Sequence, residues 1–305
     1  MIEGEPKKVI EIIYKGEDGT KNDELSIKLP KNVRQIGDCD HNNIKIYVED
    51  LRPECKKTIV FLHGWPANHN LFEYQFNKLP KLGYRCIGID TRGFGKSDKP
   101  FNGYDYNTLA EDLKDVVEAL GLSDFTLAGH STGGAIAARY MYRYKGYGVS
   151  KLVLIAAAAP SLIKRPNFPY GLDIETVLQI IEGTYNDRPQ MLQDFGNKFF
   201  FQHSSEAFSK WFFRLGLQAA GWATAAIAKT WINEVLFADL ESISVPTLII
   251  HGIHDKIVPF ELGKIQHSMI RNSILIPFEF SGHGSFYDQK DEFNNVIDKF
   301  IGNRL

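Results

Sequence analysis

Residues 127–140, LAGHSTGGAIAARY, place Ser131 between Gly129 and Gly133. A G-x-S-x-G string marks a nucleophilic serine only where a strand leads into it and a helix leads out of it. The run FTLAGH before the serine is apolar and strand-like, whereas GAIAARYMYRY after it favours a helix. The context therefore favours a sharp turn that exposes the Ser131 hydroxyl as a nucleophile. A purely structural serine in a turn is the less favoured interpretation.

Short apolar runs alternate with helical patterns on both sides of this stretch. This alternation predicts an α/β fold, with a mostly parallel central sheet and helices on both faces. Several runs are apolar throughout, as expected of strands that are covered on both faces. The runs are IKIYVED, KTIVFLHG, YRCIGID, FTLAGHS, KLVLIAAAA, PTLIIHG and ILIPFEF.

The helix expected over residues 107–121 shows how the sequence marks helix ends. Thr108 and Glu111 have the spacing of a capping box, and Gly121 provides a stop. Between them the apolar residues fall on one helical stripe, so this helix is expected to pack on the sheet.

Three segments are expected along the chain. Residues 31–160 and 241–305 form the α/β core, and residues 161–240, which lack strand-like runs, form an inserted helical lid. Residues 1–30 are expected to be an N-terminal extension, with a β-hairpin at the sheet edge. The lid segment holds Trp211, Trp222 and Trp231. Most of its aromatic residues are expected to pack the lid on the core, and a minority to line an apolar pocket.

Composition excludes several classes of function. The 305 residues are 44% hydrophobic and 24% charged, with a formal net charge of -2, which is typical of an ordinary globular protein rather than a disordered or fibrous one. That balance predicts no nucleic-acid partner, and no apolar run is long enough to cross a membrane. The start MIEGEPKK lacks the basic and apolar regions of a secretory signal, so none is expected, and three cysteines without metal-type spacing indicate a reduced protein. A cytoplasmic location is expected, and a homo-oligomer is left open.

A nucleophilic serine needs a base and an acid that orients the base. His283, in the glycine-flanked loop SGHGSF after an apolar strand, is the expected base. Asp255, in LIIHGIHDKIVP after the preceding strand, is the expected acid. The expected catalytic residues are therefore Ser131, Asp255 and His283.

Other assignments are weaker. Asp90, Asp98 and Asp288 are alternative acids that are more simply explained as loop or capping residues. His251 and His254 have no carboxylate cluster at metal-ligand spacing, so no metal is expected. The string RGFGKSDKP ends like a phosphate-binding loop, but Asp90 stands where that loop needs glycine, and no cofactor is expected.

Two backbone N–H groups are needed to stabilise the oxyanion of acyl transfer. Thr132 follows the nucleophile and is the first expected donor. Trp65, in the loop HGWP at 63–66, is the second, because Pro66 has no N–H. His63 is expected to brace this loop rather than to take part in catalysis.

Six motifs in order carry a family resemblance: HGWP, DTRGFGKSDKP, GYDYNTLAEDL, GHSTGGAIAARY, HGIHDKIVP and SGHGSF. From about residue 40 to the C-terminus the chain resembles the α/β-hydrolases, in the branch of cofactor-free (non-haem) haloperoxidases and aryl esterases or perhydrolases. By this resemblance Ser131, Asp255 and His283 match the triad, and Trp65 and Thr132 match the oxyanion hole. The chain departs from the family pattern at His130, Ala135 and Ile136, where phenylalanine, glycine and glutamate are common.

The resemblance implies an acyl-enzyme, made from a small, fairly apolar ester or a carboxylic acid and resolved by water or hydrogen peroxide. Peroxide would yield a peracid that oxidises halide without a metal or haem. A lactonase and a hydrolase-fold ligand receptor with slow turnover stay open as alternatives. Dehalogenation is disfavoured, because its nucleophile at this position is an aspartate. The acyl chain length, the physiological substrate and the role of the N-terminal extension are left open.

Overall fold

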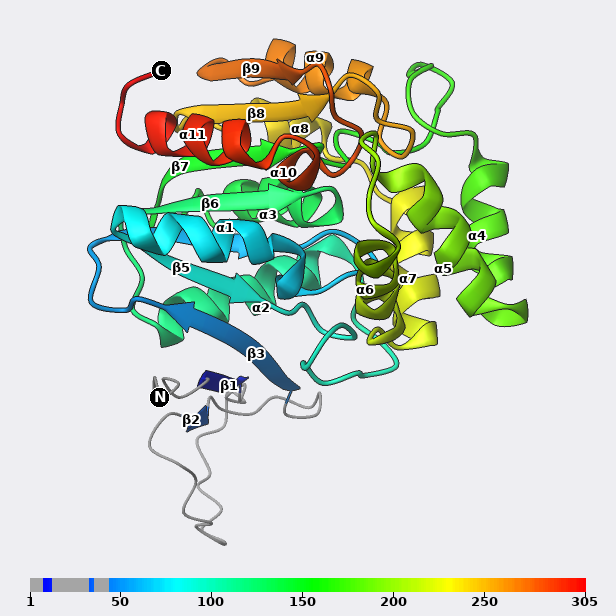
Figure 1. Cartoon of the computed structure of the whole chain (residues 1–305), viewed down its shortest axis with the longest axis horizontal. Helices are drawn as coiled ribbons and strands as arrows, with labels where there is room; N and C mark the ends of the chain where they lie inside the picture. The colour runs from blue at the N-terminus through cyan, green and yellow to red at the C-terminus, as the bar shows by residue number, and fades with distance from the viewer. Residues whose placement is uncertain (1–7, 13–32, 36–43) are drawn as a thin grey trace, which may run out of the picture.

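One twisted sheet runs through the centre of the protein (Figure 1). The computed structural model describes residues 8–12, 33–35 and 44–305 of the chain. Within these residues the strand order is β2-β1-β3-β5-β4-β6-β7-β8-β9. The strands are β1 Lys8–Ile12, β2 Val33–Gln35, β3 Ile44–Leu51, β4 Lys57–Leu62, β5 Tyr84–Ile89, β6 Phe125–His130, β7 Val149–Ile155, β8 Thr247–Gly252 and β9 Ser273–Phe278.

Helices cover both faces of this sheet. In Figure 1, α1, α10 and α11 lie in front of the sheet, and α2, α3, α8 and α9 lie behind it. The α-helices are α1 Glu73–Lys78, α2 Tyr106–Ala119, α3 Thr132–Arg143, α4 Ile174–Asn186, α5 Arg188–Phe199, α6 Glu206–Leu217, α7 Gly221–Asn233, α8 Phe237–Glu241, α9 Phe260–Met269, α10 Ser285–Asp288 and α11 Lys290–Ile301. Two 3-10 helices, η1 His69–Phe72 and η2 Leu79–Leu82, flank α1.

The expected α/β fold is confirmed. Strands β5, β4, β6, β7, β8 and β9 pair in parallel, and β3 joins them antiparallel to β5. The seven apolar runs correspond to β3 through β9. One boundary differs: β7 ends at Ile155, because Ala156 has a φ of +43° and the chain turns away from the strand there. The small residues that follow pack against the serine turn, where a Cβ on Gly134 would lie 2.4 Å from Cβ of Ala157.

The insertion between β7 and β8 is helical. Figure 1 shows α4, α5, α6 and α7 grouped beyond the carboxyl ends of the parallel strands β4 to β9. Helix α8 returns to the layer behind the sheet and contacts α3 and α9. Residues 161–240 thus place four helices over the sheet edge from which Ser131 emerges.

At the N-terminal edge, β1 pairs antiparallel with β3 and parallel with β2. The turn and the second strand of the hairpin expected within residues 1–30 lie outside the described residues. In the described part of the chain, no helix has both the length and the apolar character needed to cross a membrane.

The predicted capping box at the start of α2 is wrong. The helix begins at Tyr106, and Asp105 caps it, accepting hydrogen bonds from the Thr108 N–H at 3.0 Å and the Thr108 hydroxyl at 2.7 Å. A carboxylate near the positive end of a helix is favoured over a hydroxyl three residues inside it. Glu111 is exposed and has no capping contact among the described residues. The expected stop is close to correct, since Leu120 and Gly121 follow the last helical residue and Gly121 has a φ of +61°.

We expect Asp105→Ala to lower the free energy of unfolding by about 1 kcal/mol, because the N–H of Thr108 loses its acceptor. Urea denaturation at neutral pH measures this change. The matched control is Glu111→Ala, which should stay within about 0.5 kcal/mol of the parent protein. An equal loss in both variants would instead support the capping box.

Candidate active site

Ser131 lies on a strained turn between β6 and α3. Its φ of +53° and ψ of −118° are conformations that non-glycine residues rarely adopt. Gly129 and Gly133 permit the turn, since a Cβ on Gly129 would lie 2.4 Å from the Gly133 oxygen, and one on Gly133 would lie 2.4 Å from the Leu62 oxygen. The strand, turn and helix expected around the serine are therefore present in that order.

Asp255 and His283 form a buried pair in the loops after β8 and β9. The Nδ1–H of His283 donates to Oδ2 of Asp255 at 2.7 Å, and both side chains are fully buried. Oδ1 of Asp255 accepts the N–H groups of Ile257 and Val258, each at 2.8 Å. These bonds fix the carboxylate and hold His283 in the tautomer whose Nε2 is free to accept a proton.

The Asp255 carboxyl is ionised despite its burial. Burial raises its pKa, but the adjacent His283 and the hydrogen bonds from His251 and His283 outweigh that effect, so the pKa lies well below its ordinary value. His251 is a contact that the sequence analysis did not assign. Its Nε2 lies 3.3 Å from Oδ2 of Asp255 and donates to the Val258 carbonyl at 2.8 Å.

His130 joins the serine turn to the loop of His283. Its Nε2–H donates to the His283 backbone carbonyl at 3.0 Å, and the two ring centroids are 4.5 Å apart. Nε2 of His283 is buried and has no hydrogen-bond partner within the described residues. The structure thus brings the turn of Ser131 and the Asp255–His283 pair together at the carboxyl edge of the sheet.

The loop HGWP after β4 lies against the same turn. A Cβ on Gly64 would lie 2.9 Å from Cβ of Ser131. Among the hydrogen bonds of the described residues, the backbone N–H groups of Trp65 and Thr132 have no protein acceptor. For Thr132 this follows from its position as the first residue of α3, where an N–H has no partner within the helix.

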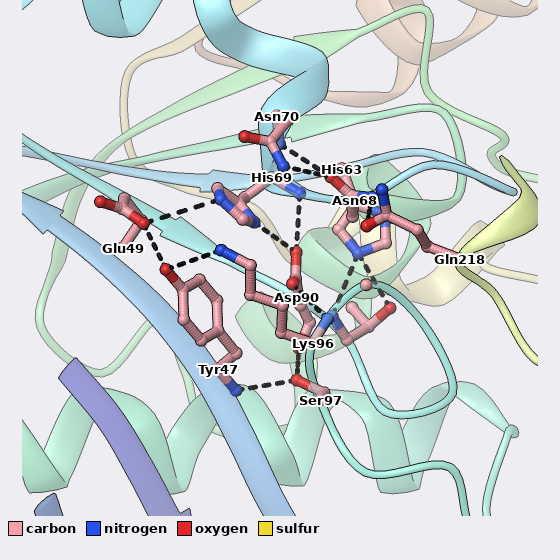
Figure 2. Close-up of polar contacts among 12 residues, drawn as sticks. Tyr47, Glu49, His63, Asn68, His69, Asn70, Asp90, Lys96, Ser97 and Gln218 are labelled. Carbon is pink, nitrogen blue, oxygen red and sulfur yellow. Dashed lines mark hydrogen bonds and ion pairs between the residues drawn. The ribbon is translucent and has the colours of Figure 1, made fainter. Parts of the chain in front are cut away.

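A buried polar cluster anchors the HGWP loop (Figure 2). Oδ1 of Asp90 accepts the backbone N–H of His69 at 2.8 Å and its Nδ1–H at 2.7 Å, and Oδ2 accepts the Lys96 N–H at 2.8 Å. At the other end of the loop, His63 accepts the Thr91 N–H at 3.0 Å through Nε2. His63 therefore has the bracing contacts expected of it.

The other rival acids also have structural contacts. Asp98 accepts the Lys45 N–H at 2.8 Å. Asp288 accepts three backbone N–H groups, from Phe201, Gln202 and Gly282. No group of three or more histidine, cysteine, aspartate or glutamate side chains in the described part of the chain could hold a metal ion.

Ser131 opens onto a cavity of about 380 Å³ beneath the inserted helices. Trp65 and Trp231 line it together with apolar residues that include Leu162, Ile180 and Phe195. Trp65 meets Trp231 edge to face, with ring centroids 5.1 Å apart. Trp231 also donates through Nε1 to the Thr132 hydroxyl at 3.0 Å. Of the three insertion tryptophans, Trp231 is thus the one that lines this cavity.

Comparison with known proteins decides the family. A family model described as "alpha/beta hydrolase fold" matches residues 57–290. The chain belongs to the α/β-hydrolase family. The superfamily protein YisY of Bacillus subtilis is 46% identical over 261 residues, covering 85% of this chain and 96% of the relative. An esterase structure from Exiguobacterium antarcticum superposes with a TM-score of 0.83 at 43% identity, covering 85% of this chain and 96% of the other.

Other relatives place this α/β-hydrolase in the expected branch. A bromoperoxidase structure from Bacillus anthracis has a TM-score of 0.83 at 36% identity, covering 86% of this chain and 97% of that one. A bifunctional esterase/perhydrolase from Acinetobacter calcoaceticus is 31% identical over 271 residues, covering 85% of this chain and 97% of the relative. The resemblance to non-haem haloperoxidases and esterases is confirmed, and with it the prediction of a hydrolase-type enzyme.

We expect the free energy of unfolding to fall as the pH is lowered from about 6.5 to 4.5. Burial lowers the pKa of both His63 and His130. In the unfolded chain their pKa values are about 6.5, so below this pH the unfolded state binds more protons than the folded state. Each histidine contributes a slope of at most about 1.4 kcal/mol per pH unit. The lowered pKa of Asp255 also makes the folded state less stable as the pH falls, but mainly below the ordinary aspartate pKa of about 3.9.

Urea denaturation at half-unit pH intervals measures this slope. His63→Gln removes one of the two histidines, so its slope should be smaller than that of the parent. A stability that does not change between pH 6.5 and 4.5 would contradict the prediction.

Proposed function

We propose that this α/β-hydrolase is a carboxylesterase that uses Ser131, His283 and Asp255 as a catalytic triad. The observation that carries the proposal is the buried Asp255–His283 pair. Nε2 of His283 has no hydrogen-bond partner among the described residues, and His130 bonds the backbone of His283 from the residue before Ser131. Acyl transfer by a serine requires a histidine base that is hydrogen-bonded to an ionised acid and lies beside a serine on a sharp strand-to-helix turn.

The reaction follows from these positions. Ser131 Oγ attacks the ester carbonyl while His283 Nε2 takes the hydroxyl proton, so the two atoms must come within about 2.6–3.2 Å of each other. The N–H groups of Trp65 and Thr132 stabilise the oxyanion of the tetrahedral intermediate. His283 then gives its proton to the departing alcohol, which leaves an acyl-Ser131 intermediate. Water, deprotonated by His283, attacks this intermediate, and His283 returns the proton to Ser131 Oγ as the carboxylic acid leaves.

The substrate is proposed to be a small, fairly apolar ester. Charged side chains that include Asp187 and Lys256 also line the cavity, while Trp65, Trp231 and aliphatic side chains favour an apolar acyl or alcohol group. Residues 161–240 are proposed to act as the lid, because Trp231 and Phe195 in this segment line the cavity. Asp255 stays ionised when His283 becomes an imidazolium, which lowers the barrier of both transfer steps.

Perhydrolysis is a second proposed activity, favoured by the esterase/perhydrolase and bromoperoxidase relatives. Hydrogen peroxide replaces water in the attack on acyl-Ser131, so the product is a peracid and the serine is restored. The peracid then transfers its terminal oxygen to bromide, which takes up a proton to become hypobromous acid, and the peracid is reduced to the carboxylic acid. This route requires no cofactor, because the peroxide supplies the oxidising equivalent.

We expect Ser131→Ala to lower kcat/KM on p-nitrophenyl acetate and butyrate by about 10,000-fold or more, because the nucleophile is lost. Release of p-nitrophenol, followed by absorbance, measures the rate. Ser150→Ala is the matched control, since Ser150 lies on β7 and its hydroxyl donates to the Phe125 carbonyl. Activity that survives in Ser131→Ala, or a parent protein inactive on the whole ester panel, would contradict the proposal.

We expect bromination by the parent protein to require both hydrogen peroxide and a carboxylic acid such as acetate, because the oxidant is the peracid. Bromination of a β-diketone dye, followed by absorbance with and without acetate, measures this dependence. Ser131→Ala should lose it. Bromination that is no faster with acetate and unchanged in Ser131→Ala would show that no peracid forms at this site.

A further inference from the structure

His130 links the serine turn to two other loops of the candidate active site, the HGWP loop and the loop of His283. It precedes Ser131 in the chain, and its Nε2–H binds the His283 carbonyl at 3.0 Å. On its other side, a Cβ added to Gly64 of the HGWP loop would lie 2.4 Å from Nδ1 of His130. The His130 side chain is completely buried.

The protonation state of His130 follows from these contacts. A carbonyl oxygen only accepts hydrogen bonds, so Nε2 must carry the proton. Nδ1 has no hydrogen-bond partner among the described residues and sits against Gly64. Burial, followed by the nearby His283, holds the pKa of His130 well below its ordinary value. The ring is thus neutral and donates a single hydrogen bond.

The backbone of His283 is fixed from two sides. Its N–H donates to the Phe199 carbonyl at 2.8 Å, and its carbonyl accepts from His130. Its side chain is held by Asp255 at Nδ1. Of these three attachments, only the bond from His130 comes from the residue next to Ser131 in the chain.

We propose that His130 is a positioning residue for the general base: its Nε2–H holds the His283 backbone at the distance from Ser131 that proton transfer requires. This inference rests on the proposed serine-hydrolase function. Because the ring is neutral, it adds no positive charge beside His283 when that residue takes up the serine proton. A displacement of about 1 Å in such a pair can lower the rate about 100-fold.

Two replacements separate the hydrogen bond from simple packing. His130→Phe keeps a ring against Phe199 and Phe286, whose centroids lie 5.7 and 5.1 Å from that of His130, but it removes the donor. His130→Gln places an amide N–H near the position of Nε2 and so keeps the donor. His130→Met is a second variant without a donor, and it is more adaptable in shape than phenylalanine. His267→Phe is the control, since His267 is exposed on α9 and bonds Ser273.

We expect His130→Phe and His130→Met to lower kcat on p-nitrophenyl butyrate by about 10- to 100-fold, with KM within about twofold of the parent. His130→Gln should recover most of this loss. The rate at which diethyl p-nitrophenyl phosphate phosphorylates Ser131, with release of p-nitrophenolate, should fall and recover in parallel. Mass spectrometry of the protein measures the labelling, and thermal unfolding shows that each variant is folded.

Several outcomes would overturn the inference. These are parent-like kcat in His130→Phe or His130→Met, an equal loss in His130→Gln, or a loss confined to KM. Failure of both donor-free variants to fold, while His130→Gln folds, would assign the bond to stability alone. A parent protein that neither hydrolyses esters nor labels at Ser131 would instead overturn the proposed function, and this inference with it.

Discussion

The backbone conformation of Ser131 is the constraint on which the rest of the site depends. Its positive φ costs about 1–3 kcal/mol, which the surrounding backbone must offset. The Ser131 N–H donates to the Ile155 carbonyl at 2.9 Å, and the Ser131 carbonyl accepts from Gly134, Ala135 and Ala158 at 2.9 to 3.1 Å. The turn is thus tied to β7 and to the start of α3. This explains why the residues around it are glycine and alanine, since larger side chains would separate these bonding partners.

Burial sets the charges of the ionisable groups around this turn. Asp255 is ionised in a fully buried position because His283 and two backbone N–H groups donate to it and Nε2 of His251 lies 3.3 Å from its Oδ2. His63 and His130 are neutral because burial disfavours their charged forms. The negative charge of the Asp255 carboxylate therefore lies beside His283, where the reaction proposed above generates positive charge. The histidine that supports the turn adds no competing charge.

The sequence predicted the fold well because apolar runs and turn glycines are local signals. Ser131, Asp255 and His283 could be singled out because each follows a strand that periodicity identifies, and parallel strands end at one sheet edge. The contacts of His130 and His251 could not be predicted, because they bond carbonyls of His283 and Val258 that only folding places beside them. The N-cap of α2 was predicted wrongly because both Asp105 and Thr108 are residue types that cap helices. Only the position of the first helical residue, Tyr106, shows that Asp105 is the cap.

The inserted helices are attached to the loops that carry the candidate catalytic groups. Phe199, at the end of α5, accepts the His283 N–H at 2.8 Å. Gln218, after α6, accepts from the Asn68 amide at 3.1 Å, and this contact reaches the anchored end of the HGWP loop (Figure 2). Trp231 of α7 donates to the hydroxyl of Thr132, whose backbone N–H is one of the two candidate oxyanion donors. The insertion contacts the loop of His283, the HGWP loop and the start of α3. A displacement of the inserted helices would therefore alter the geometry of all three. The segment that shapes the cavity is therefore also part of what holds the candidate catalytic groups in place.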